Sequence, residues 1–506
     1  MQTACVLARK LLLILFLLAS PAIPCLAAGD YGPRLDAIVA SYHDAGQFQG
    51  AVLVTLDDEV ILRKAYGYAD VGLGVKNTPE TRFAAASLGK SLTAAMILQL
   101  MDEGKLSLDD LLSKHLSDFP DPIAGKVTMH QMLSHTAGIP WPQDSWSREQ
   151  FVNSYTLDEL VAGCGEGQLQ FEPGSEFRYC NCCYHLAAAV VEAITGNDFE
   201  SELKRRVLGP LGMNDTGIAR RKPILERRAS GYEQTPDGGL ENVLQEDQSY
   251  ALGAGGIYTT VDDLYKWDRA LYGDELLSAN SRDLMFTKHE HGSGYGWSIG
   301  AYGKKDVGEE KVTGTYKLAL GFGGTPGYTS AAARLLDDRY FIVFLGNMRQ
   351  IPQSRLMNDL WNTILGLDVE PLDGRADADP ASSPLEVVEA LMSAFNEHDV
   401  EAMLAWVTDD VEWMFVEGAS LAVEASGKSA LGESMTSYFE KIPSARSTIE
   451  DSMASISDGG GGRFVTVLER ASWTSTKTGE ERSRASVAVY EIREGLVARV
   501  WYYPAE

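Results

Sequence analysis

The chain has 506 residues, of which 45% are hydrophobic and 23% are charged, which is typical of a folded protein with more than one domain. Asp and Glu outnumber Lys and Arg by 71 to 44, giving a formal net charge of -27. Because binding to a phosphate backbone needs clustered basic residues, this balance argues against nucleic acid as a partner.

The first 28 residues have the layout of a secretory signal peptide. Arg9 and Lys10 precede an apolar run at residues 11–19, and small residues end the segment at Ala27 and Ala28. A membrane-spanning helix needs about 20 apolar residues, so we expect no stable membrane span, with a membrane anchor as the alternative. We predict cleavage near Ala27 or Ala28 and a secreted or periplasmic protein.

Strand patterns lie at both ends of the next region, residues 50–346. Residues 50–66 are typical of two strands joined by a turn, and residues 329–346 of two more. Between them lie helical patterns at residues 87–103, 183–194 and 261–271. We therefore predict an α+β domain in which the first and last hairpins close one sheet, helices cover it, and a helical lobe is attached.

A second domain follows a polar segment. Residues 370–384 are rich in Pro, Ala and Asp, which is typical of a linker. Helical periodicity comes next at residues 385–407, and strand-like runs follow from Val411, so we expect a small α+β domain with helices first and a sheet afterwards. The predicted division is signal peptide 1–28, first domain 29–369, linker 370–384 and second domain 385–506.

The stretch AAASLGKSLTA places Ser87 and Lys90 three apart where an apolar helix begins. Both side chains then lie on one face, with the serine in the first turn. The amino end of a helix would help a serine alkoxide to form and the lysine to lose its proton. A plain helix-start serine is the alternative. The same pattern recurs at Ser201 and Lys204, where a charged stretch indicates a solvated face.

A second pattern adds Tyr179 and Asn181, a phenol and an amide two residues apart before another apolar helix. On an extended segment these side chains point into the same cleft. Together with Ser87 and Lys90 they resemble the first two active-site motifs of the serine β-lactamase and penicillin-binding-protein superfamily, in its class C, esterase and D-peptidase branch. The resemblance covers about residues 31–366. Further matching segments are residues 129–140, 171–179, 208–216, 253–267 and 294–299.

The resemblance implies a β-lactamase-like domain, with an antiparallel sheet covered by helices, and acyl-enzyme chemistry. Ser87 would attack a carbonyl, and Lys90 and Tyr179 would move its proton. Asn181 would help to hold the substrate and the lysine. We expect no cofactor and no metal.

The third motif departs from the family pattern. The family usually has Lys-Thr-Gly or His-x-Gly on the strand that faces the serine, whereas this chain has LGFGGTPGY. The basic position falls on Gly321 or, with a one-residue gap, on Phe322, and neither residue binds a carboxylate. We expect backbone N–H groups of Ser87 and of Gly323 or Gly324 to complete an oxyanion hole even so. The departure therefore favours a neutral ester or amide substrate.

Other conspicuous residues have simpler interpretations. The literal Lys-Thr-Gly at residues 477–479 lies between two predicted strands of the second domain, where a polar hairpin turn explains it. His130 and His135 have no acidic neighbours at ligand spacing, so we interpret them as packing residues. Glu166 is interpreted as a loop carboxylate rather than a base for deacylation.

Four cysteines remain after the signal segment, namely Cys164, Cys180, Cys182 and Cys183. In an oxidising compartment thiols pair, and we expect one bridge from Cys164 to one of the other three. A metal site is the alternative, although zinc ligands usually come as separated pairs.

The second domain resembles the polyketide-cyclase-like and nuclear-transport-factor-like α+β cone over residues 385–506. This resemblance concerns the fold, and we assign no site there. The domain could mediate dimerisation, and the oligomeric state stays open.

These patterns predict an exported serine hydrolase that cleaves an ester, amide or peptide bond of a small molecule through an acyl-Ser87 intermediate. The first alternative is a catalytically degenerate homologue that binds a ligand or partner, because a basic residue is missing from the third motif. The second alternative is a true β-lactamase.

Overall fold

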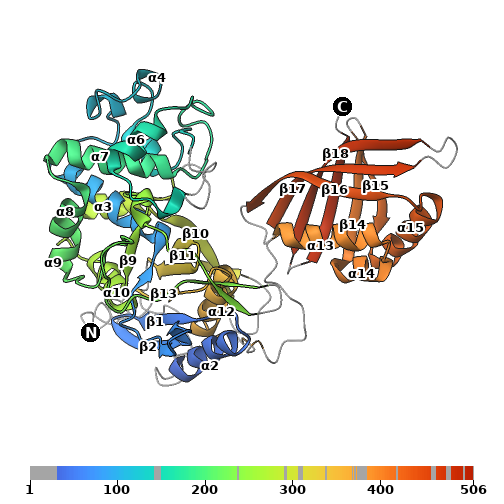
Figure 1. The fold of residues 1–506 in the computed structure, drawn as a ribbon, viewed down its shortest axis with the longest axis horizontal. Coiled ribbons are helices and arrows are strands. Elements are labelled where there is room, and N and C mark those ends of the chain that lie inside the picture. The colour runs from blue at the N-terminus through green and yellow to red at the C-terminus, as the bar shows by residue number, and fades with distance from the viewer. Residues whose placement is uncertain are drawn as a thin grey trace, which may run out of the picture. The chain divides into compact units, whose positions relative to one another are not determined.

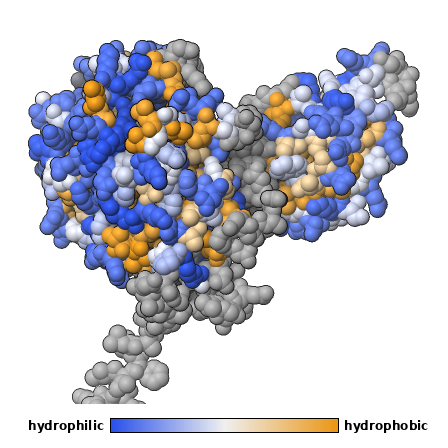
Figure 2. Space-filling view, turned by 60° about the horizontal axis from the view of Figure 1, so that its bottom comes forward, coloured by the Kyte–Doolittle hydropathy of each residue, from blue (hydrophilic) through white to orange (hydrophobic). Residues whose placement is uncertain are grey.

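The computed structural model describes residues 31–504 apart from residues 142–149, 236–238, 290–292, 306–311, 337–338, 367–368, 370–371, 373–383, 418–419, 457–462, 475–479 and 494–495. The predicted signal peptide and most of the predicted linker lie outside the described residues. The chain divides into two compact units, Met1–Gly374 and Arg375–Glu506 (Figure 1). In the described part of the chain, every helix is too short or too polar to cross a membrane. The face seen in Figure 2 is largely hydrophilic with separate hydrophobic patches.

A six-stranded antiparallel sheet organises the first unit, in the order β10-β11-β12-β13-β1-β2. Its strands are β1 (Gly50–Leu56), β2 (Glu59–Tyr66), β10 (Ser298–Lys305), β11 (Val312–Thr325), β12 (Tyr328–Leu335) and β13 (Phe341–Gly346). Gly50 pairs with Gly346, which confirms that the first and last hairpins close one sheet. A Cβ on Gly50 would lie 2.0 Å from the Leu345 carbonyl oxygen, so this close pairing requires glycine.

The helices of the first unit include the three that the sequence predicts. Residues 87–103 form the 3-10 turn η2 (Ala86–Gly89) and α3 (Lys90–Asp102), and the other two are α7 (Asn181–Thr195) and α10 (Val261–Ala270). Further helices are α2 (Tyr31–Asp44), α4 (Asp121–Ala124), α5 (Met129–Leu133), α6 (Leu157–Cys164), α8 (Phe199–Leu203), α9 (Gly209–Leu211), α11 (Ala279–Phe286) and α12 (Gln353–Ile364). Short strands are β3 (Tyr68–Asp70), β4 (Val75–Lys76), β5 (Phe83–Ala84), β6 (Gly217–Ile218), β7 (Tyr232–Gln234), β8 (Leu240–Asn242) and β9 (Ile257–Thr259).

Both faces of the six-stranded sheet are covered, as the side chains of β1 show. Ala51 and Leu53 belong to a core shared with α3 and α7, whereas Val52 and Val54 belong to a second core shared with α2 and α12. Successive side chains of a strand point to opposite faces, so a strand covered on both sides needs a continuous apolar run. The sequence AVLV meets that need.

In the described part of the second unit, helices lie beside a six-stranded sheet (Figure 1). The strand order is β15-β14-β19-β18-β17-β16, with β14 and β19 parallel and the other neighbours antiparallel. The strands are β14 (Val407–Glu417), β15 (Ser420–Ser426), β16 (Arg446–Ile456), β17 (Arg463–Thr474), β18 (Glu481–Arg493) and β19 (Leu496–Pro504). The helices are α13 (Pro384–Glu397), α14 (Val400–Ala405) and α15 (Lys428–Lys441).

The prediction that helices come first in this unit is wrong for α15. This helix lies in the chain between β15 and β16, and the sequence patterns predicted none of these three elements. The signal was present but short: Leu431, Met435 and Phe439 recur every four residues and are buried.

Candidate active site

Ser87 lies in η2, the 3-10 turn between β5 and α3, and not in the first turn of the α-helix as predicted. Ala86 has a φ of 45°, a left-handed conformation that costs energy for a residue with a Cβ. Glycine permits the tight packing around this turn, because a Cβ on Gly255 would lie 2.7 Å from the Ala86 carbonyl oxygen. The serine is therefore held in a sharp turn whose strain the surrounding structure supports.

Lys90 is the first residue of α3 and is only 2% exposed. Its Nζ lies 3.2 Å from Ser87 Oγ, and it donates to Asn181 Oδ1 at 2.6 Å and to the Ala254 carbonyl oxygen at 2.5 Å. Burial lowers the pKa of the amine well below its usual value. A neutral amine has two N–H groups and one lone pair. Because Asn181 and Ala254 accept hydrogen bonds from the two N–H groups, the lone pair is free to accept a hydrogen bond from the serine hydroxyl.

Tyr179 approaches the same oxygen. Its hydroxyl donates to Ser87 Oγ at 2.8 Å. Half of the Tyr179 surface is exposed, yet partial burial raises the pKa of its phenol to about 12, so the phenol keeps its proton at neutral pH. The Lys90 Nζ lies 4.7 Å from the centroid of the tyrosine ring. The structure therefore brings together all four side chains that the sequence predicts to be catalytic.

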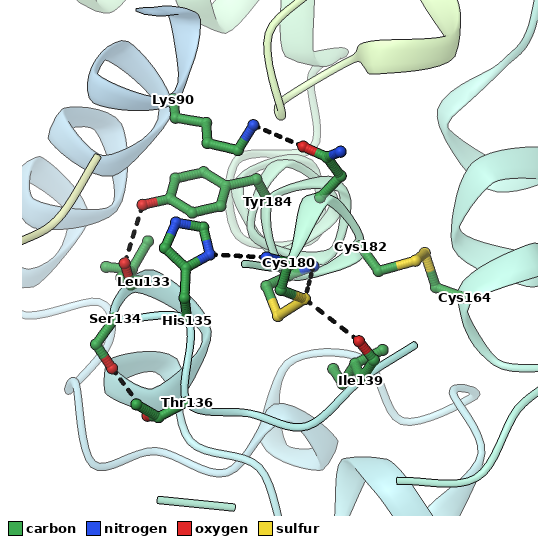
Figure 3. Close-up of a disulfide and its surroundings, with 12 residues drawn as sticks. Lys90, Leu133, Ser134, His135, Thr136, Ile139, Cys164, Cys180, Cys182 and Tyr184 are labelled. Atoms are coloured by element: carbon green, nitrogen blue, oxygen red, sulfur yellow. Dashed lines mark hydrogen bonds between the residues drawn. A yellow bond between two sulfur atoms is a disulfide. The ribbon is translucent and has the colours of Figure 1, made fainter. Parts of the chain in front are cut away.

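His135 and a disulfide support the segment that carries Tyr179 and Asn181. Figure 3 shows the hydrogen bond between His135 and Cys180 in this segment. The His135 ring stacks on the tyrosine ring with 4.6 Å between centroids, and its Nδ1 accepts from the Cys180 N–H at 3.0 Å. Burial lowers the pKa of this imidazole to about 3, so the ring is neutral. Cys180, the N-cap residue of α7, is bonded to Cys183. The bridge closes the first helical turn next to both site residues.

The bridge predicted from Cys164 is confirmed, and its partner is Cys182. It connects α6 to α7 (Figure 3). The sequence left the pairing open because four cysteines allow three connectivities. The sequence did not predict the second bridge or the packing of His135 on Tyr179. The run Ser134-His135-Thr136 has no spacing pattern that would indicate either contact.

The structure decides which residue of the third motif faces the serine. A Cβ on Gly321 would lie 2.8 Å from the Leu88 side chain and 3.5 Å from the Trp297 ring. Phe322 instead packs against the second core, on the other face of the sheet. Gly321 is thus the position on the serine side, and a side chain there would meet apolar groups.

Gly323 brings the backbone of β11 against the serine turn. A Cβ on this residue would lie 2.4 Å from the Ala85 carbonyl oxygen and 3.2 Å from Ser87 N. A Cβ on Gly324 would lie 2.6 Å from a guanidinium nitrogen of Arg349. Since consecutive residues of a strand point to opposite faces, this cation lies across the strand from Ser87.

A buried carboxylate, which the sequence analysis missed, lies at the end of β11. Glu246 accepts from Thr325 Oγ1 at 2.7 Å, from Gln248 Nε2 at 2.9 Å and from the Tyr250 hydroxyl at 3.1 Å. It is 8% exposed, and burial raises the pKa of its carboxyl. Its partner Thr325 is 79 residues away in the chain, so no local motif marks the pair.

The remaining conspicuous residues lie apart from this site. His130 Nδ1 lies 2.7 Å from the Tyr295 hydroxyl. Glu166 is exposed just after α6, and residues 477–479 are outside the described residues. Within the ranges that the structure covers, His, Cys, Asp and Glu form no group suited to a metal ion.

The antiparallel sheet, the helical lobe and the serine, lysine, tyrosine and asparagine constellation define a serine hydrolase class of protein. Residues 35–363 match the Beta-lactamase family model, and the chain belongs to this family, which includes penicillin-binding proteins. Residues 388–500 match the SnoaL-like domain model. Both matches confirm the resemblances stated from the motifs.

Individual relatives agree with this assignment. The chain is 28% identical to a putative penicillin-binding protein, PbpX of Bacillus subtilis, over 53% of this chain and 67% of that one. The penicillin-binding protein structure from Bacillus halodurans has a TM-score of 0.55 at 25% identity, covering 64% of this chain and 98% of that one. A D-amino acid amidase from Ochrobactrum anthropi has a TM-score of 0.58 at 22% identity, covering 67% and 99%, and shows the fold alone.

Proposed function

We propose that the protein is an exported hydrolase that cleaves an ester, amide or peptide bond through an acyl-Ser87 intermediate. The observation that carries this proposal is the position of Ser87 Oγ, 2.8 Å from the Tyr179 hydroxyl and 3.2 Å from Lys90 Nζ. Lys90 is buried and its pKa is lowered, as a general base at neutral pH requires.

In the acylation step, Ser87 Oγ forms a bond to the substrate carbonyl carbon as its proton passes to the Lys90 lone pair. The negative oxygen is stabilised by the backbone N–H of Ser87 and one from Gly323 or Gly324. When the carbonyl re-forms, the bond to the leaving group breaks, and the leaving group takes a proton delivered through Lys90 and Tyr179. Water then attacks the acyl carbon and gives a proton to Lys90. The bond from this carbon to Ser87 Oγ breaks, the acid leaves, and Lys90 returns the proton to Ser87 Oγ.

We infer that the substrate carries no carboxylate beside the scissile bond. The serine side of the third motif has Gly321 and no basic side chain, and the end of the same strand has the buried Glu246. With Gly321 in the basic position, an anionic group of the substrate would have no counter-charge there. The carboxylate of Glu246 would repel such a group. An amino-acid amide, which has no carboxylate, therefore fits better than a penicillin or a peptide with a free carboxyl end.

Labelling by a fluorophosphonate, followed by intact mass measurement, tests the nucleophile. We expect one adduct on the wild type and on Ser201→Ala, and none on Ser87→Ala. If a folded wild-type protein gives no adduct, the degenerate ligand-binding alternative replaces the proposal.

Two matched esters test the substrate class. p-Nitrophenyl butyrate and p-nitrophenyl hemisuccinate have acyl chains of the same length and differ only in a terminal methyl or carboxylate, and we expect kcat/KM to be about tenfold higher for the butyrate. D-Phenylalanine amide extends the test to amides. Faster cleavage of the hemisuccinate would contradict the substrate class, and rapid turnover of a chromogenic cephalosporin would favour the true β-lactamase.

Export and domain division belong to the same proposal. Two disulfides within the described residues support an oxidising compartment, because such bridges are rare in reducing ones. We place the hydrolase domain at residues 29–369 and the SnoaL-like domain at residues 385–506, joined by the linker at 370–384.

A further inference from the structure

The second unit contains a pocket of about 340 Å³, a size typical of sites for small ligands. It lies between the sheet and the helices α13 and α15, and six of its lining residues are aromatic. These are Phe395, Trp413, Phe415, Tyr438, Trp473 and Tyr502. The Tyr502 ring stacks on Phe415 with 5.2 Å between centroids and lies 5.7 Å from Trp413.

One wall of this pocket contains a buried carboxyl group. Along β17 the inward positions are Val465, Val467, Glu469, Ala471 and Trp473, so the glutamate occupies a place where the pattern calls for an apolar side chain. Val465 and Val467 are fully buried, and Glu469 is only 4% exposed.

The partners of Glu469 are hydroxyl groups. Tyr490 donates to Oε1, and Ser447 donates to Oε2 at 3.2 Å. Among the ion pairs of the described residues, none involves this carboxylate. Burying a carboxylate without a cation costs free energy, and here burial raises the pKa of the group. Arg484 and Glu424 are exposed at the pocket and give it one charge of each sign.

We propose that this pocket binds a small organic cation, an amine attached to an apolar ring-sized body, with Glu469 as its counter-ion. The ligand's ammonium group would supply the charge partner that Glu469 lacks. The faces of the surrounding rings attract cations by their quadrupoles, and the apolar body would replace water against the aromatic walls. This site is independent of the chemistry at Ser87.

Two matched probes test the ligand class by calorimetric titration of the full chain at pH 7. The probes are 2-naphthylmethylamine, which is protonated, and 2-naphthalenemethanol, its neutral counterpart. We expect the amine to bind at least about tenfold more tightly than the alcohol. In Glu469→Gln the difference should disappear, while the alcohol binds within about twofold of its wild-type affinity. Unchanged binding of the alcohol also shows that this variant is folded.

A second pair of variants tests the location. Ala471→Phe fills the pocket, whereas Ser472→Phe places the same side chain on the exposed opposite face of β17. Both probes should lose at least about tenfold in affinity for Ala471→Phe and bind Ser472→Phe normally. The proposal would be overturned if the wild type bound amine and alcohol equally well, or bound neither of them. It would also be overturned if Glu469→Gln still preferred the amine, or if Ala471→Phe bound the probes as tightly as the wild type does.

Discussion

The chain contains Ser-x-x-Lys twice, at Ser87–Lys90 and at Ser201–Lys204, and the two copies have opposite surroundings. Lys90 is buried and satisfied by neighbouring acceptors, with its pKa lowered. Ser201 is exposed and donates to Asp198 Oδ2 at 2.7 Å, and Lys204 is exposed. The same spacing therefore gives different pairs, and only the first copy, where the fold removes water from the amine and turns the serine toward it, suits the proposed reaction.

Replacing each serine by alanine should give the largest difference in activity between the two copies. Ser87→Ala removes the nucleophile, so kcat/KM for p-nitrophenyl acetate should fall at least about a thousandfold. Ser201→Ala removes only a surface hydrogen bond and should leave kcat/KM unchanged. Equal activity of the two variants would show that the first copy is not the nucleophile.

Replacing each lysine by methionine should also separate the activities of the two copies. Lys90→Met removes the base and should lower kcat by about 10² to 10⁴, whereas Lys204→Met serves as the matched control.

In the wild type, activity should rise with pH as Lys90 loses its proton. Because burial lowers its pKa, this rise should lie well below about 10.4, the usual value for lysine. A pH profile of kcat/KM measures it, and a rise centred near the ordinary lysine value would contradict a buried neutral amine.

The glycine that packs against the first copy should also matter. A Cβ on Gly323 would collide with the serine turn, so Gly323→Ala should lower kcat/KM by about 10²-fold through misplacement of Ser87. Gly300→Ala is the control, since no atom lies within 4 Å of a Cβ there. Circular dichroism of both variants separates a local shift from unfolding.

The smallest effect concerns stability in acid. His185 is fully buried, and burial lowers its pKa to about 4. The unfolded chain takes up a proton below about pH 6.5, whereas the folded chain does not, so stability present above that pH is lost as the pH falls toward 4. Between pH 7 and pH 5 the loss from this residue should be about 2 kcal/mol.

Denaturant titration of the wild type and of His185→Asn at both pH values isolates this contribution. The variant has no titrating ring, so its free energy of unfolding should fall less between pH 7 and pH 5. A fall equal to that of the wild type would show that His185 is not buried in its neutral form.

The sequence predicted which side chains lie together in the candidate site better than it predicted the contacts that support them. Ser87, Lys90, Tyr179 and Asn181 fall within two short motifs, so local spacing carries the information. The contacts that orient them join distant segments, such as the ring of His135 beneath Tyr179. Such contacts depend on how the helical lobe folds.

The third motif shows the same limit. The sequence alone left Gly321 and Phe322 as equal choices for the basic position, because a shift of one residue reverses the face of a strand. Pairing of Gly321 with Ala332 in the sheet fixes the register, and only then is Gly321 on the serine side. The closure of the sheet was predictable because β1 and β13, the strands that join the first and last hairpins, are continuous apolar runs.

The Cys180–Cys183 bridge has a practical consequence for anyone who prepares this protein. Cys180 lies between Tyr179 and Asn181, so the bridge holds the turn that carries both side chains, and a thiol reductant that reaches the bond would release this turn. Protein made in a reducing cytoplasm would lack this bridge, so we expect its activity to depend on the expression host and on the purification buffer. The choice of expression compartment therefore becomes a variable of every rate measurement.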